Sequence, residues 1–218
     1  MDGGMVAARV RLDPGLVREA ERLGLDVPNL VRRALVEVAG ERFVIPSSAP
    51  ERKRWPPMRV RVPRSIWERF VQRFGSLSAV ACYAEVKLDY HIRRMEALMS
   101  MTDDEIMELL RRAPMGPKGG VPVSVYLPEP VVEAARRANV AIGLVVKRAL
   151  LVFAAENLPP VSPLTRPDVG KARVTVRVPR PVAEKLSSVG GPSRAWWFVA
   201  RALLACARKA REVMARGV

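Results

Sequence analysis

Apolar and polar residues alternate in four short stretches of the chain, and each stretch is followed by apolar residues at helical spacing. Alternation at every second position is typical of a strand with one buried face, and spacings of three and four residues are typical of amphipathic helices. The alternating stretches are Val6–Leu12, Met58–Val62, Val121–Leu127 and Ala172–Val178. The pattern therefore predicts four repeats, each a strand followed by two helices.

The repeats have similar residues at equivalent positions where one element ends and the next begins. A proline follows each predicted strand, where a strand ends and a helix can begin; these prolines are Pro14, Pro63, Pro128 and Pro179. The second, more apolar helix of every repeat has alanine at one position, where a small side chain lets helices cross closely: Ala34, Ala84, Ala149 and Ala202. Asp26, Ser76 and Ser193 are expected to cap second helices, whereas the third repeat has Ala141 in that place.

The first repeat resembles the third and the second resembles the fourth, so the chain reads as a duplicated pair. Proline-rich linkers join the members of each pair, but the middle junction differs: Thr102–Glu105 is a capping box that opens a helix over 102–112. We place the domain boundary in the Pro/Gly stretch Ala113–Gly120. The expected modules are 1–113, with repeats at about 5–42 and 57–98 and the junction helix 102–112, and 114–218, with repeats at about 121–157 and 171–215.

A strand, a helix, a turn and a second helix within about 40 residues resemble the ribbon-helix-helix family of the Arc and methionine repressors. The resemblance implies a mostly α-helical fold with short strands: four ribbon-helix-helix units form two pseudo-dimeric modules, each a two-stranded antiparallel ribbon over four helices. A lone strand leaves its backbone groups unpaired, so each repeat needs a partner. Pairing of adjacent repeats is the simplest arrangement. Pairing of one with three and two with four, or exchange of strands between chains, stays open.

The resemblance also implies a site, because ribbons of this family enter the DNA major groove and read base edges with outward side chains. The alternation assigns nine base-contacting residues: Arg9, Arg11, Arg59, Arg61, Ser124, Tyr126, Arg173, Thr175 and Arg177. Simple solvation would explain the polarity of these faces but not their lack of Glu, Asp and Lys. The family also holds a phosphate at the second helix, where Ser76, Ser78, Ser193 and Arg194 suit the role. Capping alone is the alternative role for these residues.

Charge points to an anionic partner. The chain has 37 Lys and Arg against 22 Asp and Glu, a net charge of +15, and nucleic acid is the first expectation for such an excess. Residues 1–113 carry a net +4 and residues 114–218 a net +11, so the second module is expected to supply more of the sequence-independent affinity. Arg outnumbers Lys 30 to 7 and amides are scarce, which favours a thermophile; a GC-rich genome is the alternative.

Catalytic and metal chemistry are not indicated. The single His and two Cys make no zinc site of familiar spacing, and a disulfide framework is not expected. We interpret His91 as a surface or packing residue and Cys206 as a core residue. The sequence contains neither a Gly-rich phosphate loop nor an evident carboxylate pair, so we expect no enzyme, no cofactor and no small-molecule substrate. The longest apolar stretch stops at Lys147, which argues against a membrane span or partner.

The leading interpretation is therefore a cytoplasmic, nucleoid-associated protein whose partner is double-stranded DNA, most simply a transcriptional regulator. An architectural or partition-type protein that coats DNA with little sequence specificity is the alternative, favoured by the all-arginine first ribbon. An antitoxin-like protein-interaction module is a third and weaker hypothesis. Self-association is possible under each hypothesis but not required.

Overall fold

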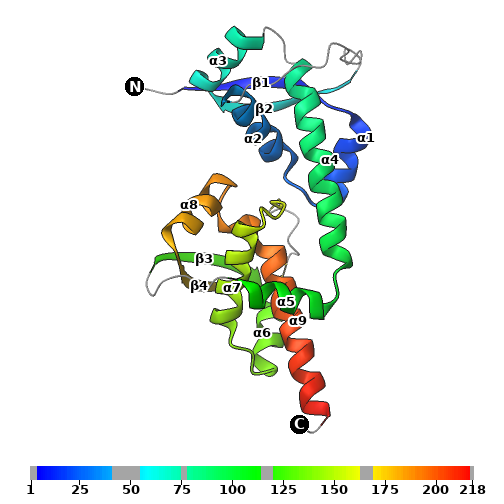
Figure 1. The fold of residues 1–218 in the computed structure, drawn as a ribbon, viewed down its shortest axis with the longest axis vertical. Helices are drawn as coiled ribbons and strands as arrows, with labels where there is room; N and C mark the ends of the chain where they lie inside the picture. Colours follow the sequence, from blue (N-terminus) through cyan, green and yellow to red (C-terminus); the bar gives the residue numbers. More distant parts are fainter. Residues whose placement is uncertain (1–3, 41–54, 75–77, 114–119, 163–168, 217–218) are drawn as a thin grey trace. The chain divides into compact units, whose positions relative to one another are not determined.

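The computed structural model describes residues 4–40, 55–74, 78–113, 120–162 and 169–216 (Figure 1). Within these ranges the protein is mostly helical, with nine α-helices and two small two-stranded antiparallel sheets. None of these helices is long and apolar enough to cross a bilayer. The chain divides into two compact units, Met1–Met95 and Glu96–Val218.

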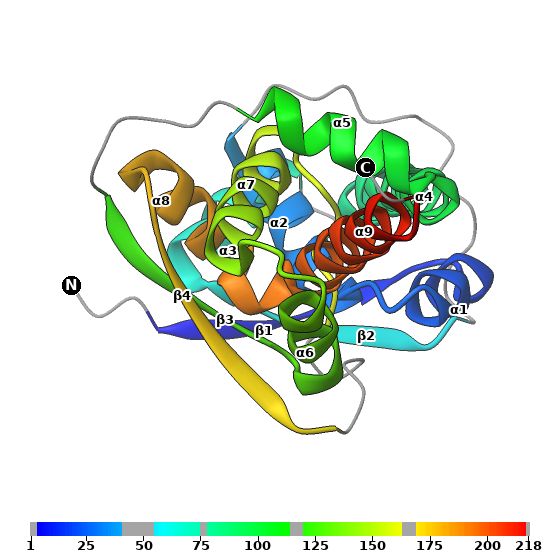
Figure 2. The same ribbon diagram turned by 90° about the horizontal axis from the view of Figure 1, so that it is seen from below.

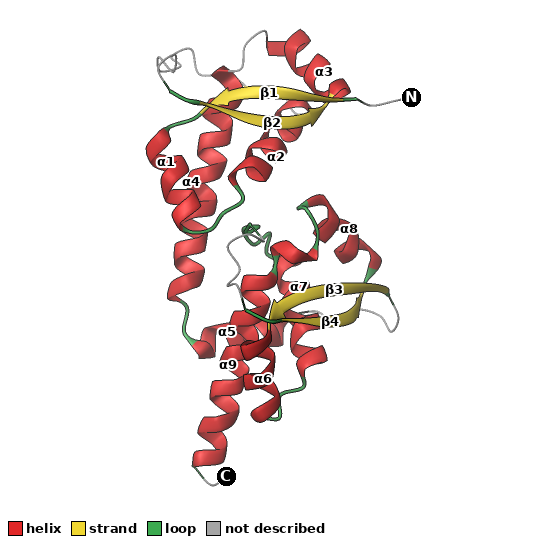
Figure 3. Ribbon diagram, turned by 180° about the vertical axis from the view of Figure 1, so that it is seen from behind, coloured by secondary structure: helices red, strands yellow, loops and turns green. Residues whose placement is uncertain are grey.

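The first unit contains the first two predicted repeats. Its elements are β1 (Met5–Arg11), α1 (Pro14–Arg22), α2 (Val27–Gly40), β2 (Pro57–Pro63), α3 (Arg64–Phe74) and most of α4 (Ser78–Ser100). β1 and β2 pair antiparallel, and the alternation buries one face of both strands: Ala8, Val10, Val60 and Val62 are each at most 3% exposed. The helices cover this face, and the other face of the sheet is open (Figure 3).

The second unit contains the other two repeats and an additional helix. Its elements are α5 (Asp103–Arg112), β3 (Val121–Pro128), α6 (Glu129–Arg137), α7 (Ile142–Ala155), β4 (Lys171–Val178), α8 (Arg180–Ser188), the 3-10 turn η2 (Pro192–Arg194) and α9 (Trp196–Ala215). β3 pairs antiparallel with β4. Helices α7 and α9 pack against each other with Ala149 and Ala202 fully buried. Ala34 and Ala84 are also buried in the first unit, as expected for positions of close packing.

The strand register relates the paired repeats by an approximate two-fold axis. In the alignment of the repeats, Arg9 is the counterpart of Arg59, and in the first sheet these two residues lie directly opposite each other. Ser124 and Thr175 are likewise counterparts, and they are opposite each other in the second sheet. Pairing of adjacent repeats is therefore confirmed for the strands, and pairing of the first strand with the third is excluded.

Helix α5 lies in the core of the second unit, although the sequence analysis assigned residues 102–112 to the first module. Ile106 is 0% exposed and Leu110 3% exposed, and both belong to a cluster of buried residues with α7 and α9. Figure 2 shows α5 alongside these two helices. The compact units consequently divide at Met95, not in Ala113–Gly120. A Pro/Gly stretch indicates a loop, but it does not determine which core an amphipathic helix joins.

The helix caps agree in part with expectation. The Asp26 carboxylate accepts a hydrogen bond from the Asn29 N–H, at 3.4 Å, in the first turn of α2. The capping box at Thr102 is confirmed, and Ala141, at the cap position before α7, provides no side-chain cap. The expected cap at Ser193 is wrong: η2 places Ser193 ahead of α9, whose cap position is Ala195. Ser76 lies outside the described residues.

Candidate nucleic-acid interface

The open face of the first sheet carries four exposed arginines. Arg9 lies opposite Arg59, Arg61 opposite Ala7, and Arg11 opposite Pro57. The alternation therefore gathers Arg9, Arg11, Arg59 and Arg61 on one face, as the sequence predicted. Neither strand contains an acidic residue, so the charge of this face is not balanced from within the sheet.

Most of these arginines have no partner within the described part of the chain. Arg11 donates from Nε to the Trp55 carbonyl oxygen at 3.1 Å, whereas Arg9, Arg59 and Arg61 form no hydrogen bond or ion pair with a described residue. Like charges directly opposite each other destabilise a sheet. Repulsion between Arg9 and Arg59 therefore lowers the stability of the unbound protein slightly. A bound anion would reduce this repulsion.

The second sheet presents a hydrogen-bonded polar face. The hydroxyls of Ser124 and Thr175 lie 2.9 Å apart, and Arg173 donates from Nε to the Ser124 hydroxyl at 3.1 Å. Arg177 donates to the carbonyl oxygen of Gly120 at 3.0 Å. Tyr126, opposite Arg173, is exposed, and only Ser124 among the nine predicted residues is half-buried. Contacts with β3 and with Gly120, the residue before it, thus orient Arg173 and Arg177.

Gly120 supports this arrangement through its backbone. Its φ is +131°, and a Cβ at this position would lie 2.3 Å from the Val178 carbonyl oxygen, so a side chain would require the backbone to move. Glycine therefore lets the chain approach the end of β4, where its carbonyl meets Arg177. The sequence did not single out Gly120, because the Pro/Gly composition of this stretch predicts a loop but no role for an individual residue.

Lys171 is a further cation that sequence reasoning missed. It is exposed in the same alternation phase as Arg173, at the start of β4 and opposite Pro128. The alternating pattern continues back to this residue, one position before Ala172, at which the sequence predicts the strand to start. The outward face of β4 therefore carries three cations, Lys171, Arg173 and Arg177.

The predicted phosphate contacts are only partly described. Ser78 is the first residue of α4, but its side chain and the whole of Ser76 lie outside the described parts. Ser193 and Arg194 are half-buried in η2, which packs beside β3. The α9 helix that follows begins without a side-chain cap, so Ser193 and Arg194 lie between the second sheet and a helix N-terminus that favours anions.

The positive charge is shared almost equally by the two units. Residues 1–95 contain 18 basic and 11 acidic residues, a net +7, and residues 96–218 contain 19 and 11, a net +8. The expected excess in the second module depended on the boundary at 113. The observed division moves Glu96 and the acidic residues of α5 into the second unit, and the excess disappears.

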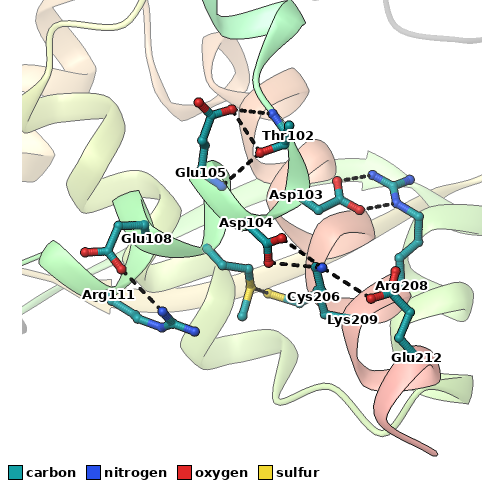
Figure 4. A network of polar contacts seen from close by, with 11 residues as sticks. Thr102, Asp103, Asp104, Glu105, Glu108, Arg111, Cys206, Arg208, Lys209 and Glu212 are labelled. Carbon is teal, nitrogen blue, oxygen red and sulfur yellow. Dashed lines mark hydrogen bonds and ion pairs between the residues drawn. The ribbon is translucent and has the colours of Figure 1, made fainter. Parts of the chain in front are cut away.

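Acidic residues of α5 neutralise cations of α9 (Figure 4). Asp103 forms two hydrogen bonds of 2.6 Å with Arg208, and Asp104 lies 3.0 Å from Lys209. The hydrogen bond from Arg208 holds the pKa of Asp103 below its ordinary value. Arg208 and Lys209 of α9 are therefore paired with carboxylates of the same unit, unlike Arg9, Arg59 and Arg61 of the first sheet.

The single histidine is a packing residue, as interpreted from the sequence. His91 is 9% exposed, and its ring meets Tyr90 edge-on at 5.4 Å between centroids. Burial, with the nearby charges of Arg33 and Lys87, lowers the pKa of His91 to about 4. The described residues contain no group of three or more His, Cys, Asp or Glu side chains that could hold a metal ion. Cys206 is half-buried, 3.2 Å from the Met107 sulfur.

Comparisons of the chain with protein-family models, with curated proteins and with solved structures find no match.

Proposed function

We propose that this protein binds double-stranded DNA by placing its two-stranded sheets in the major groove, and that it regulates transcription. In this proposal each unit is a pseudo-dimeric ribbon-helix-helix module, built from two repeats of one chain. One observation carries the proposal: the open face of the first sheet bears the opposed pair Arg9 and Arg59, whose charge nothing in the described structure balances. Such a face suits a polyanion, and DNA binding would associate the protein with the nucleoid.

The dimensions and chemistry of the sheets support a major-groove site. The groove is about 12 Å wide and admits a two-stranded ribbon, and arginine can donate two hydrogen bonds to guanine O6 and N7. The second sheet adds hydroxyl groups and Tyr126, which suit other base edges and the thymine methyl group. Ser193 and Arg194 would contact the phosphate backbone beside this sheet.

A second candidate function is the coating of DNA with little sequence choice. It is favoured by one observation: the first sheet offers four arginines but neither Asn nor Gln, the side chains that read adenine. Arginines on such a face could contact phosphates alone. The two candidates differ in what the sheets read, not in whether they bind.

The deciding experiment selects duplexes from a random pool with the full-length protein, and then compares affinities for selected and scrambled duplexes at one salt concentration. A regulator gives a ratio of about 10³ or more, whereas a coating protein gives a ratio near one. Arg9→Ala and Arg177→Ala should weaken binding more than Arg18→Ala, which removes an exposed arginine of α1. Equal affinity of all three variants and the unmodified protein would contradict both candidates.

A further inference from the structure

The outward face of the first sheet is chemically symmetric about its two-fold axis. The axis passes through the Arg9–Arg59 pair and relates Arg11 to Arg61 and Ala7 to Pro57. A half-turn therefore places each of the four arginine positions on that of another, although Arg11 donates to the Trp55 carbonyl and its counterpart Arg61 has no described partner. The two strands belong to different repeats of one chain, but they present the same set of donors.

A symmetric set of donors is satisfied best by a symmetric set of acceptors. A palindromic duplex has a two-fold axis through its centre, and guanine on one strand then has a symmetry-related guanine on the other. Arginine prefers guanine because its two parallel N–H donors match O6 and N7. The four arginines therefore suit a short palindrome with guanine on both strands.

The second sheet lacks this symmetry. Its axis passes through Ser124 and Thr175, the one counterpart pair that is chemically similar; beyond it, Tyr126 is the counterpart of Arg177, and Pro122 of Arg173. All the outward cations, Lys171, Arg173 and Arg177, are on β4, and β3 has none. A half-turn would exchange a ring for a guanidinium group. A palindrome would consequently mismatch one of the two strands.

We propose that the first sheet recognises a palindromic element with guanine on both strands, whereas the second recognises a non-palindromic element and fixes the direction in which its unit lies on the duplex. The inference rests on the proposed function and adds the sequence class that each sheet prefers. Hydrogen bonds from Arg173 to Ser124 and from Arg177 to Gly120 support the second half of it, because both run from β4 to β3 or the residue before it, and β3 has no arginine that could form the symmetry-related bonds.

The test repeats the selection from random duplexes with the full-length protein and with Arg9→Ala, Arg59→Ala and Arg173→Ala, using Arg18→Ala as the matched loss of one exposed charge. We expect a motif with a palindromic block and a non-palindromic block. Arg9→Ala and Arg59→Ala should each relax one guanine of the palindrome, on opposite strands, and the loss of discrimination should be equal, about 5- to 150-fold at each position. Arg173→Ala should relax a base pair in the other block only, and Arg18→Ala should change no preference.

A second measurement uses one selected duplex in which the non-palindromic block alone is reversed. We expect weaker binding to this duplex. Substitution of the guanine on either strand of the palindrome should cost the same affinity, because the two contacts are equivalent.

The outcomes separate this inference from the proposed function. A motif without a palindromic block, unequal guanine losses, or full affinity for the reversed duplex would overturn the inference while DNA recognition stood. Binding without base preference would overturn it in favour of DNA coating. A protein that binds no duplex would overturn both.

Discussion

The two sheets share an order of elements and a register, but they treat their charged side chains differently. In the first sheet Arg9, Arg59 and Arg61 have no partner among the described residues. In the second sheet Arg173 donates to Ser124 of β3, and Arg177 donates to the carbonyl of Gly120, the residue before β3. The contrast shows that sequence alternation fixes which side chains face outward, whereas cross-strand neighbours decide whether these side chains are held before a ligand arrives. A held side chain loses less conformational freedom on binding.

The second unit also gains core from α5, and this difference gives the largest expected effect. Ile106→Ala removes a fully buried side chain between α5 and the rest of the core, which should cost about 2–5 kcal/mol of unfolding free energy. Leu109→Ala, at a half-buried position on the same helix, should cost less. Denaturant titration of each variant measures the loss of unfolding free energy, and amide hydrogen exchange shows in which unit the loss occurs. If Ile106→Ala accelerates amide exchange more in residues 4–95 than in the second unit, α5 packs in the core of the first unit instead.

The only histidine of the chain lies in the first unit and should make the stability of that unit depend on pH. His91 has an ordinary pKa of 6.5 and a folded pKa of about 4, so between these values the unfolded state binds more protons. Stability of the first unit should therefore be complete above pH 6.5 and fall by about 3 kcal/mol as the pH drops to 4.

Unfolding followed at several pH values checks this prediction, with the NMR titration of the one imidazole as a direct reading of the pKa. His91→Phe should remove the pH dependence between 4 and 6.5. The second unit, which has no histidine, is the internal reference. An imidazole that titrates near 6.5 in the folded protein would contradict the burial argument.

The opposed arginines should make the first sheet slightly more stable when one is removed. Arg9→Thr ends the repulsion from Arg59 and should raise the unfolding free energy of the free protein by about 0.2–1 kcal/mol. Arg173→Thr in the second sheet removes a hydrogen bond to Ser124 and should give no gain. Thermal unfolding at low and high salt measures the difference, which should shrink as salt screens the charges. A gain that persists at high salt would have another cause.

The smallest effect concerns the ion pairs between α5 and α9. Arg208→Ala should cost a few tenths of a kcal/mol, because the Arg208 side chain is 53% exposed and water screens its attraction to Asp103. The pKa of Asp103 is lowered, so this contribution is present at neutral pH and is lost as the pH falls below the ordinary value of 3.8. Chemical unfolding of the variant at pH 7 and pH 3 checks both statements. Arg211→Ala, an exposed position on the same helix, is the control.

Short-range pattern predicted much of this molecule. Alternation identified the exposed face of each strand down to Arg9 and Arg59, and the capping box at Thr102 identified the start of α5. These features depend on residues that are neighbours in the sequence. Hydrophobic spacing likewise gave the helices, because it reflects which side of an element is buried.

The misses concern long-range choices and local turns. The apolar spacing that includes Ile106 and Leu110 predicted an amphipathic helix. It did not indicate whether α5 packs against the core of the first unit or that of the second. The predicted difference in net charge between the modules, +4 against +11, arose from the same misplacement of α5. The 3-10 turn that contains Ser193 begins after Gly191, whose φ is +94°, and it separates that serine from the helix that the sequence predicts it to cap.

The pairing of β1 with β2 inside one polypeptide has a consequence for how such a sheet can change over evolution. In a homodimer one codon specifies both halves of the paired sheet, so every substitution appears twice. Here each half has its own codons, and Tyr126 and Arg177 occupy counterpart positions that a homodimer would fill with one residue type. Pairing within one chain therefore lets the two strands diverge independently. It also makes the assembly of each sheet independent of protein concentration, so a few copies per cell suffice to keep it formed.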